Sequence, residues 1–296
     1  MGERASSSPA QTGGESTGRW LMGLAVTAGV AGAVGAVGAV VGLGAKALLS
    51  RQAAAARRII GKPLGEVAPY ADKTYKKRFG DPIELLIVGD SIAAGLGADE
   101  PRGTLGARLA KKIAKRTERA VRLTTVARVG SESSMLTKQL DKLGPDYRPD
   151  VAVIIVGGND VTHRVPVADS VKHLVAAIER LRAMGAGVVV GTCPDLGMLR
   201  PVPQPLRALG SRASRQLAAA QARAAREAGA YAVSLSDVVG PFFITNPDEM
   251  FSLDRFHPSA TGYARTAKAI LPSVLHALGY ADAIPFGHHA PVSQPG

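Results

Sequence analysis

IELLIVGDSIAAG, residues 83–95, joins a short apolar run to a turn that contains Gly89, Asp90 and Ser91. The run has the length of a buried strand, and the glycine marks its end. Ser91 therefore follows the carboxyl end of a strand, where open α/β sheets bind their ligands. A serine hydroxyl becomes a strong nucleophile only when a neighbouring base takes its proton. The stretch thus predicts a strand, and it makes Ser91 a candidate nucleophile if a base lies nearby.

Strands and helices alternate along the rest of the chain. The apolar patterns predict strands at 83–88, 123–127, 151–156, 188–191 and 231–235, and helices at 102–118, 167–184, 206–228 and from a cap at Ser259 to about residue 278. This alternation predicts an α/β fold with a five-stranded parallel sheet and helices on both faces. Right-handed crossovers would bring the loops that follow the strands to one edge of the sheet.

Polar and glycine residues follow two other predicted strands. Asn159 comes directly after the most apolar strand, within Gly157-Gly158-Asn159-Asp160. Its amide could donate a hydrogen bond to an oxyanion, which is typically worth about 3 kcal/mol in a transition state. Gly130 follows the second strand and offers a backbone N–H that a substrate could approach closely. The alternative is that both residues only form turns.

A carboxylate and an imidazole stand three residues apart near the C-terminus. Asp254-Arg255-Phe256-His257 precedes the last predicted helix. In such a turn the Asp254 carboxylate could orient the His257 ring and stabilise its protonated form. Histidine is the most common general base near neutral pH. A surface ion pair would give the same spacing, so the pair gains meaning only beside Ser91.

Taken in order, the blocks around Ser91, Gly130, Asn159 and His257 resemble those of the SGNH (GDSL-like) hydrolase family, over roughly residues 82–280, and look like an actinobacterial, membrane-linked esterase or lipase branch. The resemblance implies a flavodoxin-like three-layer domain and ester hydrolysis without metal or cofactor. It also implies Ser91 as nucleophile, His257 as base, Asp254 as its orienting carboxylate, and an oxyanion hole made by Ser91, Gly130 and Asn159. Thr125 departs from the family, which often has asparagine there, and this puts the support of the site in question.

The N-terminal part contains a long run without charge, from Trp20 to Ala45. A helix of about 26 residues spans about 39 Å, more than the ~30 Å hydrocarbon core of a bilayer. We therefore predict a single-pass transmembrane or signal-anchor helix at 20–45. Glycines recur every third residue within it, at Gly29, Gly32, Gly35 and Gly38. Such small residues let helices approach closely, which allows self-association.

The domain organisation follows from these segments. We predict a disordered N-terminus at 1–19, the membrane helix at 20–45, a basic linker at 46–81, the hydrolase domain at 82–280 and a disordered tail at 281–296. The linker could lie on anionic headgroups or be a solvated spacer. Basic residues after the hydrophobic run favour a cytoplasmic domain, whereas the family resemblance favours the cell envelope, so both faces of the membrane stay open.

Composition restricts the partners. Lys and Arg total 36 against 24 Asp and Glu, a net charge of +12, which favours contact with anionic surfaces. Aromatic residues make up only 4% of the chain, so we expect no nucleic-acid partner that depends on base stacking. The single cysteine, Cys193, cannot form an internal disulfide.

The function that these observations favour is hydrolysis of small-molecule or lipid acyl esters. A deacetylase of O-acetylated cell-wall polysaccharide would use the same triad. A non-catalytic module could bind anionic membranes through the basic stretch 102–122. A metal phosphoesterase could use Asp90, Asp160, Asp254 and His257, but the sequence lacks the dense ligand clusters that a two-metal site needs.

Overall fold

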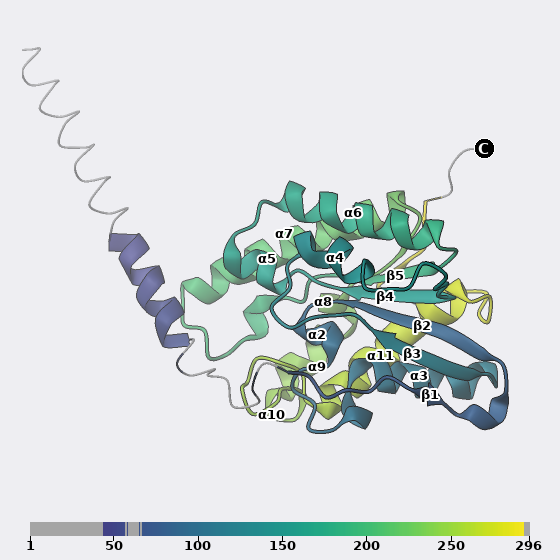
Figure 1. Ribbon diagram of the computed structural model, residues 1–296. Coiled ribbons are helices and arrows are strands. Elements are labelled where there is room, and N and C mark those ends of the chain that lie inside the picture. Colours follow the sequence, from purple (N-terminus) through teal and green to yellow (C-terminus); the bar gives the residue numbers. More distant parts are fainter. Residues whose placement is uncertain (1–43, 57, 59–64, 66, 293–296) are drawn as a thin grey trace, which may run out of the picture. The chain divides into compact units, whose positions relative to one another are not determined.

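The computed structural model describes residues 44–56, 58, 65 and 67–292 (Figure 1). The chain divides into two units, Met1–Arg51 and Gln52–Gly296, and the described residues of the first unit are helical. The predicted disordered N-terminus, the glycines proposed for self-association and almost all of the predicted membrane helix lie outside the described residues. Among the helices that are described, none combines the length and the apolar character that a membrane crossing needs.

The second unit is built on a seven-stranded sheet with the order β1-β3-β2-β4-β5-β6-β7. The strands are β1 Thr74–Tyr75, β2 Pro82–Gly89, β3 Ala120–Thr125, β4 Val151–Ile155, β5 Gly187–Gly191, β6 Tyr231–Val233 and β7 His288–His289. The five central strands are parallel, and the two edge strands pair in the antiparallel direction. The predicted five-stranded parallel sheet is thus the centre of a mostly parallel sheet that is two strands wider.

Both additional strands come from segments that we expected to lie outside the domain. β1 lies in the predicted linker 46–81, and β7 lies in the predicted tail 281–296. The folded domain therefore extends past residues 82 and 280. Strands of two residues are too short to show alternation, so a sequence pattern cannot reveal them.

Helices connect and cover the strands. They are α2 Ser91–Ala94, α3 Leu105–Thr117, α4 Leu136–Leu140, α5 Gly158–His163, α6 Val167–Ala183, α7 Leu206–Glu227, α8 Leu235–Val238, α9 Gly240–Thr245, α10 Pro247–Met250 and α11 Ala260–Ala277. Short 3₁₀ helices are η1 Lys77–Phe79, η2 Pro101–Gly103, η3 Ser133–Met135 and η4 Leu196–Met198. α3 begins later than predicted because the Thr104 hydroxyl caps it by accepting from Ala107 N. The predicted cap at Ser259 is present, with Gly262 N as donor.

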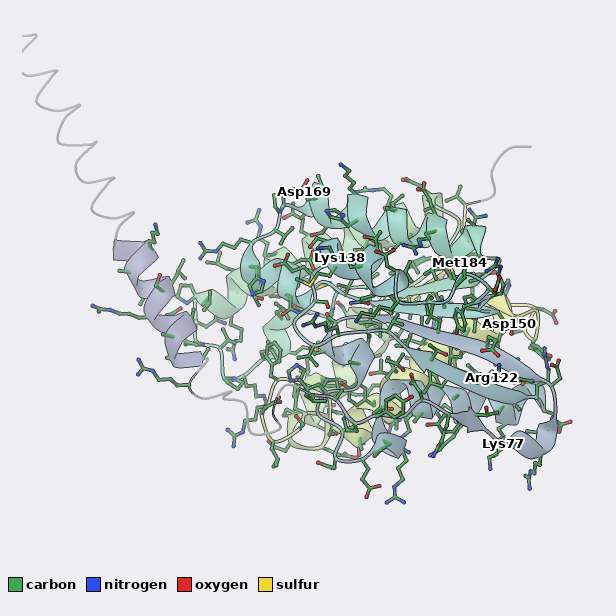
Figure 2. All side chains as sticks on the ribbon, viewed as in Figure 1. Lys77, Arg122, Lys138, Asp150, Asp169 and Met184 are labelled. Atoms are coloured by element: carbon green, nitrogen blue, oxygen red, sulfur yellow. The ribbon has the colours of Figure 1, made fainter. Side chains whose placement is uncertain are left out.

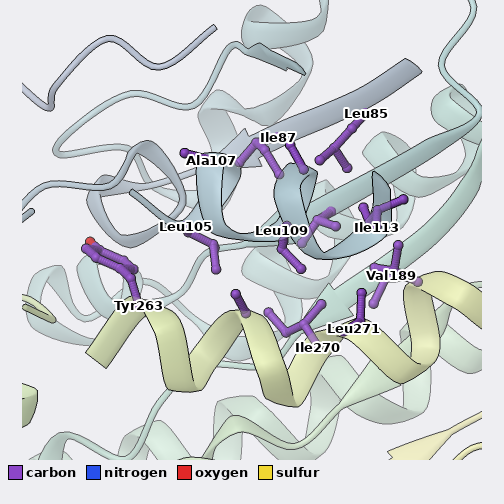
Figure 3. Close-up of a cluster of buried hydrophobic side chains, with 14 of the residues drawn as sticks. Leu85, Ile87, Leu105, Ala107, Leu109, Ile113, Val189, Tyr263, Ile270 and Leu271 are labelled. Atoms are coloured by element: carbon purple, nitrogen blue, oxygen red, sulfur yellow. The ribbon is translucent and has the colours of Figure 1, made fainter. Parts of the chain in front are cut away.

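The sheet lies between two helical layers (Figure 1). Successive strand residues point to opposite faces. In β2, Leu85 and Ile87 pack against α3 and α11, in the cluster shown in Figure 3, whereas Leu86 and Val88 pack with α4 and α6 on the other face. The domain is therefore a three-layer α/β fold, and its buried strands hold the loops that follow them in fixed positions.

Glycines let two of these strands end in sharp turns. Gly89 has a φ of 136°, and a side-chain Cβ there would lie 1.8 Å from the Ile155 carbonyl oxygen. Gly157 has the same φ, and a Cβ there would lie 2.9 Å from that of Cys193. Only glycine tolerates both the conformation and the close approach. These turns place Ser91 and Asn159 at the same edge of the sheet.

Candidate active site

Ser91 is the first residue of α2, directly after β2. The Asp90 carboxylate caps this short helix by accepting a hydrogen bond from Ile92 N at 2.9 Å. The Ser91 side chain is nearly buried but borders a cavity. The turn thus presents the hydroxyl to that cavity while it holds the backbone in place.

The His257 ring lies between Ser91 and Asp254. Its Nε2 atom is 2.9 Å from Ser91 Oγ, and its Nδ1 atom is 2.6 Å from Asp254 Oδ2. An ionised carboxylate can only accept hydrogen bonds, so Nδ1 carries the ring proton and Nε2 accepts from the serine hydroxyl. The structure therefore brings together the three residues that the sequence suggested as a catalytic set.

Asp254 is fixed by its other oxygen. Oδ1 accepts hydrogen bonds from Ser252 Oγ at 2.8 Å and from the backbone N–H groups of Phe256 and His257 at 2.9 Å each. Burial by itself raises the pKa of Asp254, but the hydrogen bonds from His257, Phe256 and Ser252 outweigh it and lower the pKa from 3.8 to about 2. The carboxylate is therefore ionised at any pH near neutrality and can stabilise a protonated His257 ring.

The predicted oxyanion donors lie on neighbouring loops. Asn159, in α5, borders the same cavity as Ser91, and its Nδ2 donates to the Ser131 carbonyl at 2.9 Å. This bond uses one amide hydrogen and leaves the other for a ligand. Gly130 has a φ of 79° in the turn after β3 and lines an adjacent groove together with Ala93 and Ala94 of α2. The turn is tied to the nucleophile strand, because Arg128 N donates to the Gly89 carbonyl at 3.0 Å.

Two buried glutamines, which no pattern in the sequence singled out, hold the strand ends. Gln139 of α4 accepts from Gly89 N at 2.9 Å, and its Nε2 lies 2.8 Å from the Gly89 carbonyl and 3.0 Å from Ser131 Oγ. Gln221 of α7 accepts from Cys193 N at 2.7 Å and donates to the Val156 carbonyl at 3.0 Å. Gln139 thus joins the nucleophile turn to the loop that carries Gly130. No sequence motif marks either residue, because the partners are backbone groups far away in the chain.

Asp160 anchors the Asn159 helix. Its side chain is fully buried, its two oxygens accept from Ser133 N at 3.1 and 3.2 Å, and Oδ1 also accepts from Ser170 Oγ at 2.7 Å. On the surface, His163 Nδ1 lies 2.6 Å from Glu132 Oε1. Together with the Asn159–Ser131 bond, these contacts attach α5 to the loop at 131–133, so the two loops that carry oxyanion donors form one unit.

An apolar cavity of about 70 Å³ extends from Ser91 and is partly open to solvent. Its wall combines residues of the segment around η4 with residues of α8, of α9 and of the junction between them, namely Pro194, Asp195, Leu196, Met198, Leu199, Leu235, Val239, Gly240 and Phe243. The proline-rich loop at 194–205 therefore supplies part of the wall. The helices of the opposite wall were not predicted, since glycine and proline interrupt the pattern from residue 235 to 250.

Asp90 is a second carboxyl group at the site. It is almost completely buried, and this burial raises its pKa from 3.8 to about 6, although hydrogen bonds from Ile92 N and Ala93 N and the charge of His257 act in the opposite direction. Of the four residues considered for a metal site, Asp254 and His257 bond to each other. Asp90 accepts from Ile92 N, and Asp160 accepts from Ser133 N and Ser170 Oγ. Within the described residues, no three His, Cys, Asp or Glu side chains form a group that could hold a metal ion.

Comparisons with known proteins identify the family. Residues 87–265 match the GDSL-like Lipase/Acylhydrolase family. The chain is 40% identical over 268 residues to the GDSL-like esterase Rv1075c of Mycobacterium tuberculosis, which covers 86% of this chain and 83% of that protein. It is 28% identical over 196 residues to the esterase TesA of Pseudomonas aeruginosa, covering 64% of this chain and 87% of TesA.

Solved structures share the fold. A crystal structure of TesA matches 66% of this chain and 99% of its own with a TM-score of 0.54 at 25% identity. The psychrotrophic esterase EstA from Pseudoalteromonas sp. matches 66% of this chain and 98% of its own with a TM-score of 0.53 at 20% identity. The second likeness concerns the fold alone.

Proposed function

Since the chain belongs to the GDSL-like lipase/acylhydrolase family and is an esterase, we propose that it hydrolyses carboxylic acyl esters through a covalent intermediate on Ser91. The observation that carries the proposal is the pair of short distances from the His257 ring to Ser91 and Asp254. A nucleophile, a base and an orienting carboxylate in hydrogen-bond contact are the arrangement that acyl transfer needs.

The first half of the reaction forms the acyl-enzyme. Ser91 Oγ attacks the ester carbonyl carbon while His257 Nε2 takes the hydroxyl proton. The buried Asp254 carboxylate stabilises the imidazolium that results. The tetrahedral intermediate then collapses, its bond to the alcohol oxygen breaks, and His257 returns the proton to the leaving alcohol. Water repeats the sequence on the acyl-serine and releases the carboxylic acid and the free hydroxyl of Ser91.

Three N–H groups would stabilise the oxyanion of each intermediate. We assign this role to the backbone N–H groups of Ser91 and Gly130 and to the second amide hydrogen of Asn159. Asn159 is fixed by its bond to Ser131 before the substrate arrives, so the donor needs no reorganisation during the reaction. Preorganised donors of this kind are often the largest single contribution to catalysis.

The cavity supports a substrate with an acyl chain longer than acetyl. Its wall is mainly aliphatic and aromatic, which matches a hydrocarbon chain better than a sugar. This favours an esterase or lipase of short to medium acyl chains over a polysaccharide deacetylase. The contact between Ser91 and His257 likewise argues against a non-catalytic module.

We also propose that the protein is held at a membrane in the cell envelope. The uncharged run at 20–45 supports attachment to a membrane, and the family resemblance supports the envelope side. An anchor of this kind would keep the catalytic unit close to acyl-ester lipids.

The proposal is tested with p-nitrophenyl esters of increasing acyl length. We expect hydrolysis that is highest for butyrate to octanoate, that persists in EDTA, and that is lost in Ser91→Ala. Ser211→Ala, a serine-to-alanine change in α7 away from the triad, is the matched control and should keep full activity. Equal activity in Ser91→Ala and in the control would contradict the assigned nucleophile.

A further inference from the structure

The outer face of α3 carries only basic side chains. Arg108, Lys111, Lys112, Lys115 and Arg116 recur at intervals of three and four residues, so they form one stripe along the helix. The opposite face buries Leu105, Leu109 and Ile113 in the core, and the helix contains no acidic residue. Like charges at this spacing destabilise a helix, so the stripe does not serve the stability of α3.

Basic residues from neighbouring segments extend this stripe. Burial lowers the pKa of Lys111, and the charges of Arg108, Lys73, Arg102 and Lys76 lower it further, so these cations lie close together. Lys77 and Arg78 of η1 follow directly after β1, which lies at the edge of the sheet. We call these residues the basic edge: Lys73, Lys76, Lys77, Arg78, Arg102, Arg108, Lys111, Lys112, Lys115 and Arg116.

The basic edge differs from other charged parts of the surface. Arg119 pairs with Asp81, and Arg122 pairs with Glu84, each at 2.6 Å. Within the basic edge, Arg102 is the only residue that forms an ion pair with a described carboxylate, that of Glu100. Cations that lack local counter-charges form a surface complementary to a polyanion.

We propose that the basic edge docks the catalytic domain on the anionic headgroups of a lipid bilayer. Two exposed apolar side chains accompany it, because Val67 is 84% and Tyr70 is 79% exposed in the segment that leads into β1. Tyrosine is favoured at membrane interfaces, where its ring and hydroxyl meet apolar and polar surroundings. The uncharged run at 20–45 lies upstream of this edge in the chain, so a membrane anchor would keep the edge near the bilayer.

This placement relates the membrane to the catalytic site. Thr104 and Gly106, at the start of α3, line the groove that Gly130 also lines. Docking through α3 and β1 therefore brings that groove close to the headgroups. The inference rests on the proposed membrane attachment and specifies which face of the domain meets the lipid; it does not depend on the role of Ser91.

The full chain is bound to vesicles of phosphatidylcholine, with or without phosphatidylglycerol, and its lysines are acetylated and quantified by mass spectrometry. Lys73, Lys77 and Lys115 represent the basic edge. Lys138, Lys142 and Lys172 are the matched controls, since they are exposed and come from the α4 and α6 side of the sheet; Figure 2 shows Lys77 and Lys138 on opposite sides. We expect the first three lysines to be protected on anionic vesicles only, and the controls to react equally on both.

Two triple variants of the full chain extend the test. One carries Lys73→Gln, Lys77→Gln and Lys115→Gln, and the other carries Lys138→Gln, Lys142→Gln and Lys172→Gln. A basic residue near an anionic surface contributes roughly fivefold to partitioning, so the first variant should lose about a hundredfold of the preference for anionic vesicles. The second variant should lose little.

Three outcomes would overturn the proposal. These are equal labelling of the two lysine sets on anionic vesicles, the same loss of preference in both variants, and protection of the basic-edge lysines by duplex DNA but not by anionic vesicles. Lysine labelling needs no turnover, so it can be repeated in Ser91→Ala. Failure of the docking proposal can therefore be told apart from failure of the catalytic proposal. Binding to phosphatidylcholine vesicles, which contain no anionic lipid, measures the contribution of the hydrophobic run at 20–45 separately.

Discussion

Gln139 hydrogen-bonds both backbone groups of Gly89, with 2.9 Å between its Oε1 and Gly89 N and 2.8 Å between its Nε2 and the Gly89 carbonyl oxygen. Gly89 is the last residue of β2, two positions before Ser91. The same Nε2 lies 3.0 Å from Ser131 Oγ, beside the carbonyl that Asn159 contacts. A single buried side chain therefore fixes the nucleophile turn relative to the oxyanion loop.

Gln139→Leu should lower kcat more than its effect on stability explains. The variant keeps the volume of the side chain but leaves Gly89 N without its partner and leaves the Gly89 carbonyl with Arg128 N alone. Misplacement of a reacting group by about 1 Å can cost about a hundredfold in rate. Gln221→Leu is the comparison, because it removes an equivalent clamp from Val156 and Cys193. We expect both variants to have a lower thermal midpoint than the native protein. We expect kcat of Gln139→Leu to be at least tenfold lower than kcat of Gln221→Leu. Equal reductions in kcat would make Gln139 only structural.

Asn159→Ala should reduce kcat by about a hundredfold to a thousandfold with little change in KM. It removes an N–H donor whose interaction with the oxyanion strengthens only in the transition state. Steady-state kinetics with p-nitrophenyl butyrate measure this directly. An increase in KM at unchanged kcat would instead assign Asn159 to ground-state binding.

Asp90→Asn should stabilise the protein above about pH 6. Burial raises the Asp90 pKa from 3.8 to about 6 in the folded state. The unfolded chain therefore loses this proton at lower pH than the folded chain, and the stabilisation that the neutral carboxyl provides is lost as the pH rises from about 4 to 6. Asparagine is neutral at every pH and keeps the oxygen that caps α2. Urea unfolding measures the difference in unfolding free energy between the variant and the native protein. This difference should grow from about pH 4 to 6 and then level off. A constant difference from pH 4 to 8 would contradict the raised pKa.

Leu196→Trp should shift the substrate preference towards shorter acyl chains. Leu196 is half-buried in the cavity wall, so a larger side chain occupies space that the distal part of an acyl chain would fill. Each methylene excluded from an apolar site costs about 0.8 kcal/mol, or roughly fourfold in kcat/KM. We expect kcat/KM for octanoate to fall and that for acetate to stay nearly constant. Leu209→Trp, on the exposed side of α7, should leave both unchanged.

The central fold and the catalytic set could be predicted because each leaves a local signal. The apolar runs of β2 and β4 are long enough to identify, and each is followed by its glycine and its polar residues. Ser91, Asp254 and His257 are identified as a set through the order of their blocks along the chain, which resembles that of the SGNH hydrolases, since neither motif alone excludes a turn or a surface ion pair. Asp254 and His257 are also only three residues apart in the chain, so their contact depends on a local turn.

The remaining parts depend on tertiary contacts. The edge strands β1 and β7 are two residues long and form by pairing with β3 and β6. The segment from 235 to 250 folds into three short helices, and Pro241 and Pro247 lie in the first turns of two of them, where proline is tolerated. Thr125 illustrates the same limit. Its backbone N–H donates to Asp72 Oδ2 at 2.7 Å, so a residue from the predicted linker supports the place where the family often has asparagine. No spacing in the sequence could show that partner.

The nucleophilic role of Ser91 is tested most directly by intact-mass measurement after reaction of the full chain with a fluorophosphonate. We predict a single adduct that maps to Ser91, no adduct in Ser91→Ala, and much slower labelling in His257→Ala, because the base that activates the hydroxyl is then missing. Labelling of Ser91→Ala at the native rate, or an adduct on a residue other than Ser91, would contradict the account.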